Sequence, residues 1–363
     1  MKNRSLFKSL SKSLLRSSIA VFQLVVLLVV CLLGRAEGQT APSASSALRP
    51  VAASDAMIKA FDKYPIVALG DAHDCPEVYE FITSLVKNPD FPNKVNDIVV
   101  EFGNALYQDV IDRYVSGNDV SPAELNQVWR NTTQILVWDA PVYEQFFATI
   151  RGVNQSLPKQ KQIRVLLGDP PIDWSKTQTY QQWGHWLFRR DEHFTSVVEK
   201  EVLSKGRRAL LIIGGAHLMR AIDKGSITAR IESQHPQSMF IVITHTGFTE
   251  RNDELELQLK TWTVGSLAPL KGTWIGALHP RLRWPQLKNA TLVDSKVEPK
   301  LEDVADAWLY VGPRDLLTES LAFPGIYRDE YWKELNRRNT LMWGKPLAPE
   351  DFNLRGRYYV PGR

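Results

Sequence analysis

Five short segments of the chain are dominated by consecutive apolar residues without a regular polar alternation. They lie at residues 65–70, 97–102, 163–168, 209–213 and 239–244. A continuous apolar run is typical of a strand that is covered on both faces, as in parallel sheets. Segments with helical spacing separate the runs, and strand–helix–strand order favours parallel pairing through crossover connections. The pattern predicts an α/β fold: a mainly parallel, mixed central sheet with helices on both faces, in three layers.

The segments between the strands predict five main helices. Their expected ranges are 55–64, 76–87, 105–115, 142–153 and 189–204. In the third helix, Leu106, Val110 and Tyr114 are expected on the buried face; in the fifth, Phe194, Val197, Val198 and Val202 are expected to point inward. Ser121 followed by Pro122 predicts a further helix start. Residues 249–363 are less regular and rich in Trp and Pro, and one more strand is expected at 307–311.

The first 38 residues resemble an export signal. A basic region is followed by an apolar run from about Ile19 to Leu33, and Ala36 and Gly38 fit a small-x-small cleavage signature. We therefore expect an exported protein, periplasmic or extracellular, whose leader is cleaved. An uncleaved N-terminal membrane anchor is the alternative, because the run is nearly long enough to span a bilayer. Residues 39–52 are rich in Ala, Ser and Pro and predict a linker, which leaves 53–363 as a single domain.

The net charge of +4 comes from this leader. Residues 1–38 hold six of the 44 basic residues and one of the 40 acidic ones, so the remaining chain has a net charge of −1. A nearly neutral domain gives no reason to expect nucleic-acid binding. Of the two cysteines, Cys31 lies in the leader and Cys75 is alone in the rest, so no disulfide is expected within the mature chain.

Ionisable side chains that can act in catalysis or binding lie near or just after the end of each of the five predicted strands. They are His73, Glu101, Asp169, His217 and His245, in chain order. In an open parallel sheet, ligands bind beyond the carboxyl ends of the strands. We therefore expect these side chains at one edge of the sheet, where the neighbouring glycines leave room for close approach.

Two chemistries suit His73, Glu101 and His217 as catalytic residues. Two imidazoles and a carboxylate can hold a divalent metal with an open position, and such a metal activates water. Alternatively, a histidine acts as general base on water while Glu101 orients or polarises it, without a metal. The remaining polar residues of the same segments are candidates for substrate binding: Asp71, Arg190, Asp169 and His245.

The same residues resemble a known group of proteins. Gly70-Asp-Ala-His73, Glu101-Phe-Gly103, Arg190-Asp191 and Gly214-Gly-Ala-His217 are similar to motifs of the erythromycin esterase/ChaN-like superfamily, which includes the Tiki and TraB proteins. The resemblance covers about residues 55–245 and implies a mixed α/β fold with divergent activities. Tiki members are metal-dependent proteases, erythromycin esterases use a histidine base, and the ChaN branch binds haem. Asp71 stands where the family usually has Glu.

The sequence therefore supports a functional hypothesis and an alternative. The hypothesis is an exported hydrolase that acts on a small molecule or peptide through His73, Glu101 and His217, with these three residues as metal ligands if a metal is used. The alternative is a haem-binding protein without turnover, for which Tyr107, Tyr114 and the seven histidines are the available ligands. Membrane contact is expected only through the N-terminal segment.

Overall fold

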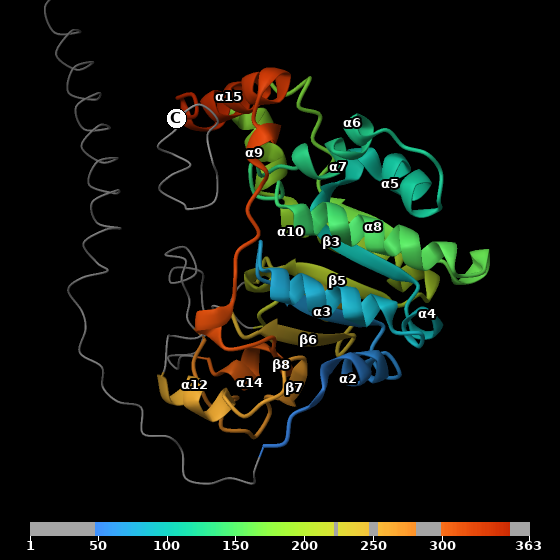
Figure 1. The fold of residues 1–363 in the computed structure, drawn as a ribbon, viewed down its shortest axis with the longest axis vertical. Coiled ribbons are helices and arrows are strands. Elements are labelled where there is room, and N and C mark those ends of the chain that lie inside the picture. The colour runs from blue at the N-terminus through green and yellow to red at the C-terminus, as the bar shows by residue number, and fades with distance from the viewer. Residues whose placement is uncertain (1–47, 221–223, 247–252, 281–298, 349–363) are drawn as a thin grey trace, which may run out of the picture. The chain divides into compact units, whose positions relative to one another are not determined.

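One eight-stranded sheet organises the part of the chain that the computed structural model describes, which is residues 48–220, 224–246, 253–280 and 299–348 (Figure 1). The strand order is β1-β7-β8-β6-β2-β5-β3-β4, and only the pairs β1–β7 and β7–β8 are antiparallel. The predicted mixed, mainly parallel sheet is confirmed. The strands are β1 (Val51–Ala52), β2 (Ile66–Asp71), β3 (Asp97–Asn104), β4 (Arg164–Asp169), β5 (Ala209–Gly214), β6 (Met239–Thr244), β7 (Ser266–Pro269) and β8 (Ala307–Tyr310).

The central strands are apolar on both faces, which explains their uninterrupted pattern. In β2, Val67 and Leu69 join one buried cluster, whereas Ile66 and Ala68 join the cluster on the opposite face. All four side chains have no exposed surface. Successive residues of a strand point to opposite faces, so both faces need a covering layer of helices.

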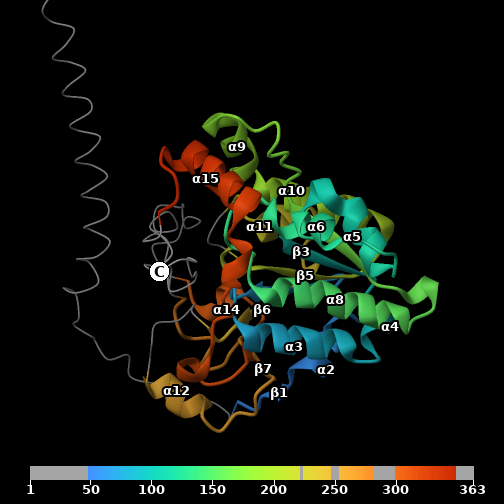
Figure 2. The same cartoon turned by 45° about the horizontal axis from the view of Figure 1, so that its top comes forward.

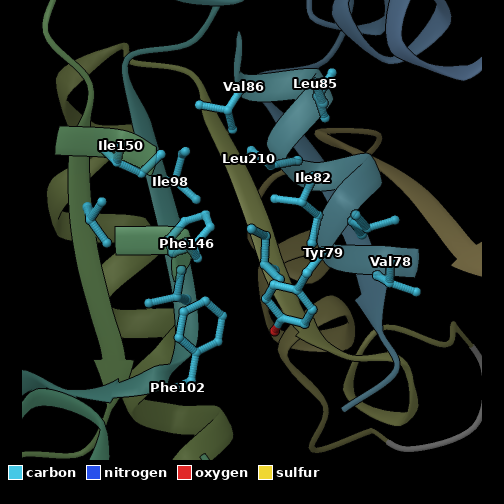
Figure 3. Packing of buried hydrophobic residues seen from close by; sticks show 14 of the residues in the cluster. Val78, Tyr79, Ile82, Leu85, Val86, Ile98, Phe102, Phe146, Ile150 and Leu210 are labelled. Atoms are coloured by element: carbon cyan, nitrogen blue, oxygen red, sulfur yellow. The ribbon is translucent and has the colours of Figure 1, made fainter. Parts of the chain in front are cut away.

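The helices that cover the first face pack most closely through α3 and α8. Figure 3 shows Ile82 and Leu85 of α3 and Phe146 and Ile150 of α8 pointing toward the sheet around Leu210. The helices of this face are α2 (Ala53–Ala60), α3 (Pro76–Lys87), α4 (Phe91–Lys94), α5 (Gln108–Val115), α6 (Pro122–Leu125), α7 (Gln127–Arg130) and α8 (Pro141–Gln155).

The second face is covered by helices from the C-terminal half of the chain. These are α10 (Arg190–Glu201), α11 (Ile227–Gln234), α12 (Asp253–Leu259) and α14 (Leu301–Val304). Two further helices, α9 (Tyr180–Leu187) and α15 (Asp329–Trp343), pack on each other beside β3 and α10, as Figures 1 and 2 show. The Trp183 and Trp343 rings meet edge to face with centroids 5.9 Å apart. The architecture is three-layer α/β, as expected.

Several local expectations need correction. Leu106 is 42% exposed, because residues 105–107 form a 3₁₀ turn capped by the Asn104 side chain and the α-helix begins only at Gln108. The predicted Val110 is buried in α5, as are Ile111 and Val115, and the predicted Tyr114 is partly buried against the same core. The sequence pattern also gave no indication of β1, β7, α9, α11, α12 or α15. Two residues of the expected linker, Val51 and Ala52, form β1.

The expected leader, residues 1–38, lies outside the described residues. Among the helices of the described ranges, none is long and apolar enough to cross a membrane.

Candidate active site

Strands β2, β5 and β3 are neighbours in the sheet. Their carboxyl ends bring His73, Glu101 and His217 together. Asp71 ends β2 and pairs in register with Gly214, which ends β5. Glu101 lies in β3, on the other side of β5. A Cβ atom at position 214 would lie 3.2 Å from both Glu101 Oε2 and His73 Cε1, so glycine allows the close approach of the two side chains.

His73 is held by the carboxylate of Asp71. His73 Nδ1 lies 2.9 Å from Asp71 Oδ2, which also accepts a hydrogen bond from Tyr79 Oη at 3.1 Å. A carboxylate can only accept hydrogen bonds, so the neutral imidazole carries its proton on Nδ1 and keeps Nε2 as the basic nitrogen. Nε2 forms no hydrogen bond with the described residues, and the His73 side chain is 29% exposed.

The surroundings of His73 favour its protonated form. Burial opposes the charge, but the hydrogen bond to Asp71 and the negative charges of Asp71, Glu101 and Asp74 raise the pKa of His73 above its ordinary value of 6.5. The imidazole is therefore a stronger base than a free histidine, and it becomes fully neutral only above its ordinary pKa.

Glu101 is a buried anion with partners on both oxygens. Oε1 accepts from Arg190 Nη2 at 2.5 Å, and Oε2 accepts from the backbone N–H of Gly214 at 2.6 Å. Burial would raise the pKa of Glu101, but the positive charges of Arg190, His73 and His217 outweigh it and lower the pKa to about 2. Glu101 thus stays ionised near neutral pH and has no proton to donate.

Arg190, the first residue of α10, connects two buried carboxylates. Besides Glu101, its Nε donates to Asp169 Oδ1 at 3.1 Å. Thr133 donates to the same carboxylate twice, through its backbone N–H at 2.6 Å and its hydroxyl at 2.7 Å. Burial, only partly offset by Arg190 and Thr133, raises the pKa of Asp169 to about 6. This network fixes β3, β4 and the start of α10 around Glu101.

His217 also lies beside Glu101. It ends a 3₁₀ turn directly after β5, and its Nε2 lies 3.8 Å from Glu101 Oε1. Its Nδ1 lies 2.6 Å from Oδ1 of Asp191. The site therefore contains two histidines that each have an aspartate at Nδ1, with the Glu101–Arg190 ion pair beside them. The predicted association of His73, Glu101 and His217 is present in the structure.

The contacts of Glu101 do not favour a divalent metal ion at the site. Each Glu101 oxygen accepts a hydrogen bond, and the guanidinium of Arg190 already compensates the negative charge that a metal ion would need. Among the described ranges, no group of three or more His, Cys, Asp or Glu side chains is arranged to hold a metal. The geometry favours the second of the two chemistries, a histidine base acting without a metal.

The four predicted substrate-binding residues differ from the expectation. Asp71, Arg190, Asp169 and His245 are all at most 6% exposed. The first three are hydrogen-bonded around the candidate catalytic residues: Asp71 to His73, Arg190 to Glu101, and Asp169 to Arg190. They therefore hold the candidate catalytic residues in position and expose little surface of their own.

His245 lies away from this cluster. It follows β6 and packs between the rings of Trp308 and Tyr310, at centroid distances of 5.4 and 5.6 Å. Its Nε2 lies 2.8 Å from Glu256 Oε1 on α12, and burial lowers its pKa. Its strand, β6, is separated from β5 and β3 by β2, and its side chain is held among Trp308, Tyr310 and Glu256, so the end of a strand did not suffice to place it in the site.

Three supporting residues were missed by the sequence interpretation. Asp191 was given no role of its own, yet its Oδ1 lies 2.6 Å from His217 Nδ1. Tyr79, one of the buried residues of α3, donates to Asp71. Trp138 contacts His73 edge to face, with ring centroids 4.5 Å apart. No sequence motif marks Tyr79 or Trp138, since both come from the apolar pattern of the first face.

The two tyrosines considered as haem ligands have other contacts. The Tyr107 hydroxyl accepts a hydrogen bond from Asn131 Nδ2 at 2.8 Å. The Tyr114 ring lies under the guanidinium of Arg151, 4.9 Å from its centroid. The geometry of the cluster around His73 involves neither.

The chain is similar to solved structures of known proteins only at low sequence identity. No family model matches the chain, and no curated protein matches it. The chain is similar to the solved structure of ChaN of Campylobacter jejuni with cofacial haem, at 16% identity over 57% of this chain and 94% of ChaN, with a TM-score of 0.36. It is similar to the type III effector HopBA1 at 12% identity over 58% and 94%, with a TM-score of 0.36. It is also similar to a succinoglycan biosynthesis protein at 9% identity over 69% and 88%, with a TM-score of 0.46.

These similarities do not define the class of the protein, which follows from its own sheet and site. The chain is a three-layer α/β protein with a His, Glu, Arg and His cluster at the carboxyl ends of its parallel strands. That cluster is the basis of the proposed function.

Proposed function

We propose that this protein is a hydrolase of ester or amide bonds in which His73 is the general base. The observation that carries the proposal is the contact of Asp71 with His73 Nδ1 at 2.9 Å, which leaves Nε2 as the basic nitrogen in a partly exposed ring. A base oriented by a buried carboxylate is a recurrent arrangement for activating water or a hydroxyl.

The proposed reaction divides proton transfer between the two histidines. His73 Nε2 takes a proton from water, and the resulting hydroxide adds to the carbonyl carbon of the substrate. Protonated His217 then donates its Nε2 proton to the leaving oxygen or nitrogen as the bond to the carbonyl carbon breaks. Exchange of protons with solvent restores neutral His73 and protonated His217.

Glu101 serves this reaction as a fixed negative charge. Its Oε1 lies 3.8 Å from His217 Nε2, the nitrogen that faces the leaving group in the proposed reaction. Because its pKa is about 2 and both oxygens are engaged, Glu101 acts as neither nucleophile nor proton carrier. Arg190 keeps Glu101 in place and compensates its charge.

Hydrolysis of p-nitrophenyl acetate by protein dialysed against EDTA tests the proposal. His73→Gln is expected to lower kcat/KM by roughly 100-fold or more, the usual contribution of a positioned general base. His185→Gln is the matched control, because His185 is exposed on α9 and its ring contacts Trp186. Equal activity of wild type and His73→Gln, or activity that returns only when a divalent metal is added, would refute the proposal.

Haem binding without turnover remains the alternative prediction of the sequence. The geometry gives it no comparable support, since the two tyrosines are engaged elsewhere. A haem titration followed by absorption would detect it through a Soret band that is lost in a histidine variant of the site.

A further inference from the structure

An apolar groove opens at the same edge of the sheet as the candidate active site. It has a volume of about 410 Å³. It lies between α3, the residues just before β7 and the residues just after β8. Its walls include Phe81 of α3 and Val264, Val311, Leu316 and Leu317. Val264 is 63% and Leu316 71% exposed, so the groove presents large aliphatic side chains to solvent.

The chain segment that lines the groove continues to the loop that carries His73. Thr318, directly after the groove residue Leu317, donates its backbone N–H and its hydroxyl to Glu77 Oε1, at 3.0 and 2.7 Å. Two residues later, the backbone N–H of Ser320 donates to the carbonyl of Asp74 at 2.6 Å. The segment that leaves the groove thus contacts the residue that follows His73.

The charges around the groove and the site select against an anionic occupant. Glu77 and Glu80 of α3 line the groove. The buried carboxylates of Asp71, Asp74 and Glu101 lie near His73. Of these three, Glu101 is paired with the guanidinium of Arg190. A free carboxylate or phosphate would meet negative charge along this path.

We propose that the groove binds the hydrocarbon acyl chain of an uncharged ester, placing the carbonyl group near His73. The inference rests on the proposed hydrolase function and names its substrate class. An acyl chain matches the aliphatic walls, and the ester group supplies the bond that the two histidines would cleave. Substrates with longer acyl chains bury more apolar surface and are therefore turned over more efficiently at low concentration.

A series of p-nitrophenyl esters with acetyl, butanoyl and octanoyl groups tests the inference. Each methylene that becomes fully buried is expected to raise kcat/KM by about fourfold, mainly through a lower KM. Ser84→Trp is the informative variant, because Ser84 is an exposed residue of α3 that lines the groove. The indole is expected to fill the groove and abolish the dependence of kcat/KM on chain length.

Ser204→Trp is the matched control. Ser204 is exposed in the turn before β5, at the opposite edge of the sheet, so this variant is expected to keep the full dependence on chain length. Acetate turnover that depends on His73 but shows no dependence on chain length, or a dependence that Ser84→Trp leaves intact, would overturn the inference while the hydrolase function stands.

Absence of any His73-dependent turnover would instead refute the hydrolase function. Binding of the neutral dye Nile red, displaced by methyl octanoate, then tests the groove separately. Loss of dye binding in Ser84→Trp but not in Ser204→Trp supports an apolar ligand in the groove, whereas equal binding in both variants contradicts it.

Discussion

Replacing Arg190 by methionine is expected to destabilise the fold strongly at neutral pH and much less at acidic pH. The guanidinium lies 2.5 Å from Glu101 Oε1 and 3.1 Å from Asp169 Oδ1, and both carboxylates are at most 1% exposed. Methionine removes the charge and both hydrogen bonds but keeps much of the side chain volume. Two buried carboxylates then remain without their shared cation.

The magnitude follows from the pKa of Glu101. A shift from the ordinary 4.5 to about 2 corresponds to about 3 kcal/mol of stabilisation of the folded state at neutral pH. Removing one partner of a buried ion pair typically costs about 3–5 kcal/mol. We therefore expect Arg190→Met to lower the free energy of unfolding by about 3 kcal/mol or more at pH 7.5.

The sign of the pH dependence follows from the same shift. In the wild type, the lowered pKa of Glu101 contributes stability that is fully present above pH 4.5 and is lost as the pH falls toward 2. Without Arg190, burial raises the pKa of Glu101, so the carboxyl protonates in the folded variant as the pH falls. The deficit of the variant is therefore expected to shrink between pH 7.5 and pH 5.

Urea unfolding followed by tryptophan fluorescence measures both quantities. Arg189→Met is the control, since Arg189 is 57% exposed and lies 3.9 Å from Glu192; exposed pairs contribute about 0–1 kcal/mol. The double variant Glu101→Gln/Arg190→Met should recover part of the loss, because it removes the unpaired charge. An Arg190→Met protein within 1 kcal/mol of wild type, or an equal deficit at both pH values, would refute the reasoning.

Three further predictions concern the base, the packing and the leader. Asp71→Asn removes a negative charge from His73, so the pKa of His73 measured by NMR should fall and hydrolysis should drop by about 10²-fold or more; an unchanged pKa would contradict the role of Asp71. Gly168→Ala would place a Cβ 1.9 Å from Phe194 Cε1 and 2.9 Å from a backbone oxygen, so urea unfolding should show a loss of about 1–3 kcal/mol, whereas wild-type stability would mean that Phe194 moves freely. Expression of the full chain in a bacterial host, followed by N-terminal sequencing of the exported protein, should find cleavage after residue 38; an intact chain in the membrane fraction would favour the anchor instead.

The central sheet could be predicted from the sequence because its signal is local. Strands buried on both faces need apolar residues along their length; β5 has them throughout, and β2 and β6 at every position but the last. The strands β1 and β7 have two and four residues, and their conformation depends on the pairing of β1 with β7 and of β7 with β8. No local pattern specifies such strands, since their partners are distant in the chain.

The site was predictable to the extent that it lies at strand ends. His73, Glu101 and His217 come together because parallel neighbouring strands end at one edge of the sheet. The roles of Asp191 and Tyr79 depend on where α10 and α3 pack, which spacing along the chain does not show. His245 lies outside the site for a related reason: its position depends on where β6 stands in the strand order, next to β8 and separated from β5 and β3 by β2.

The pH dependence of kcat/KM for a neutral ester, measured after treatment with EDTA, tests the central claim most directly. If His73 is the general base, activity rises with pH with a midpoint above 6.5, because the surrounding carboxylates raise the pKa of His73, and this rise is absent in His73→Gln. A profile that is flat, or that keeps the same midpoint and amplitude in His73→Gln, would contradict the account.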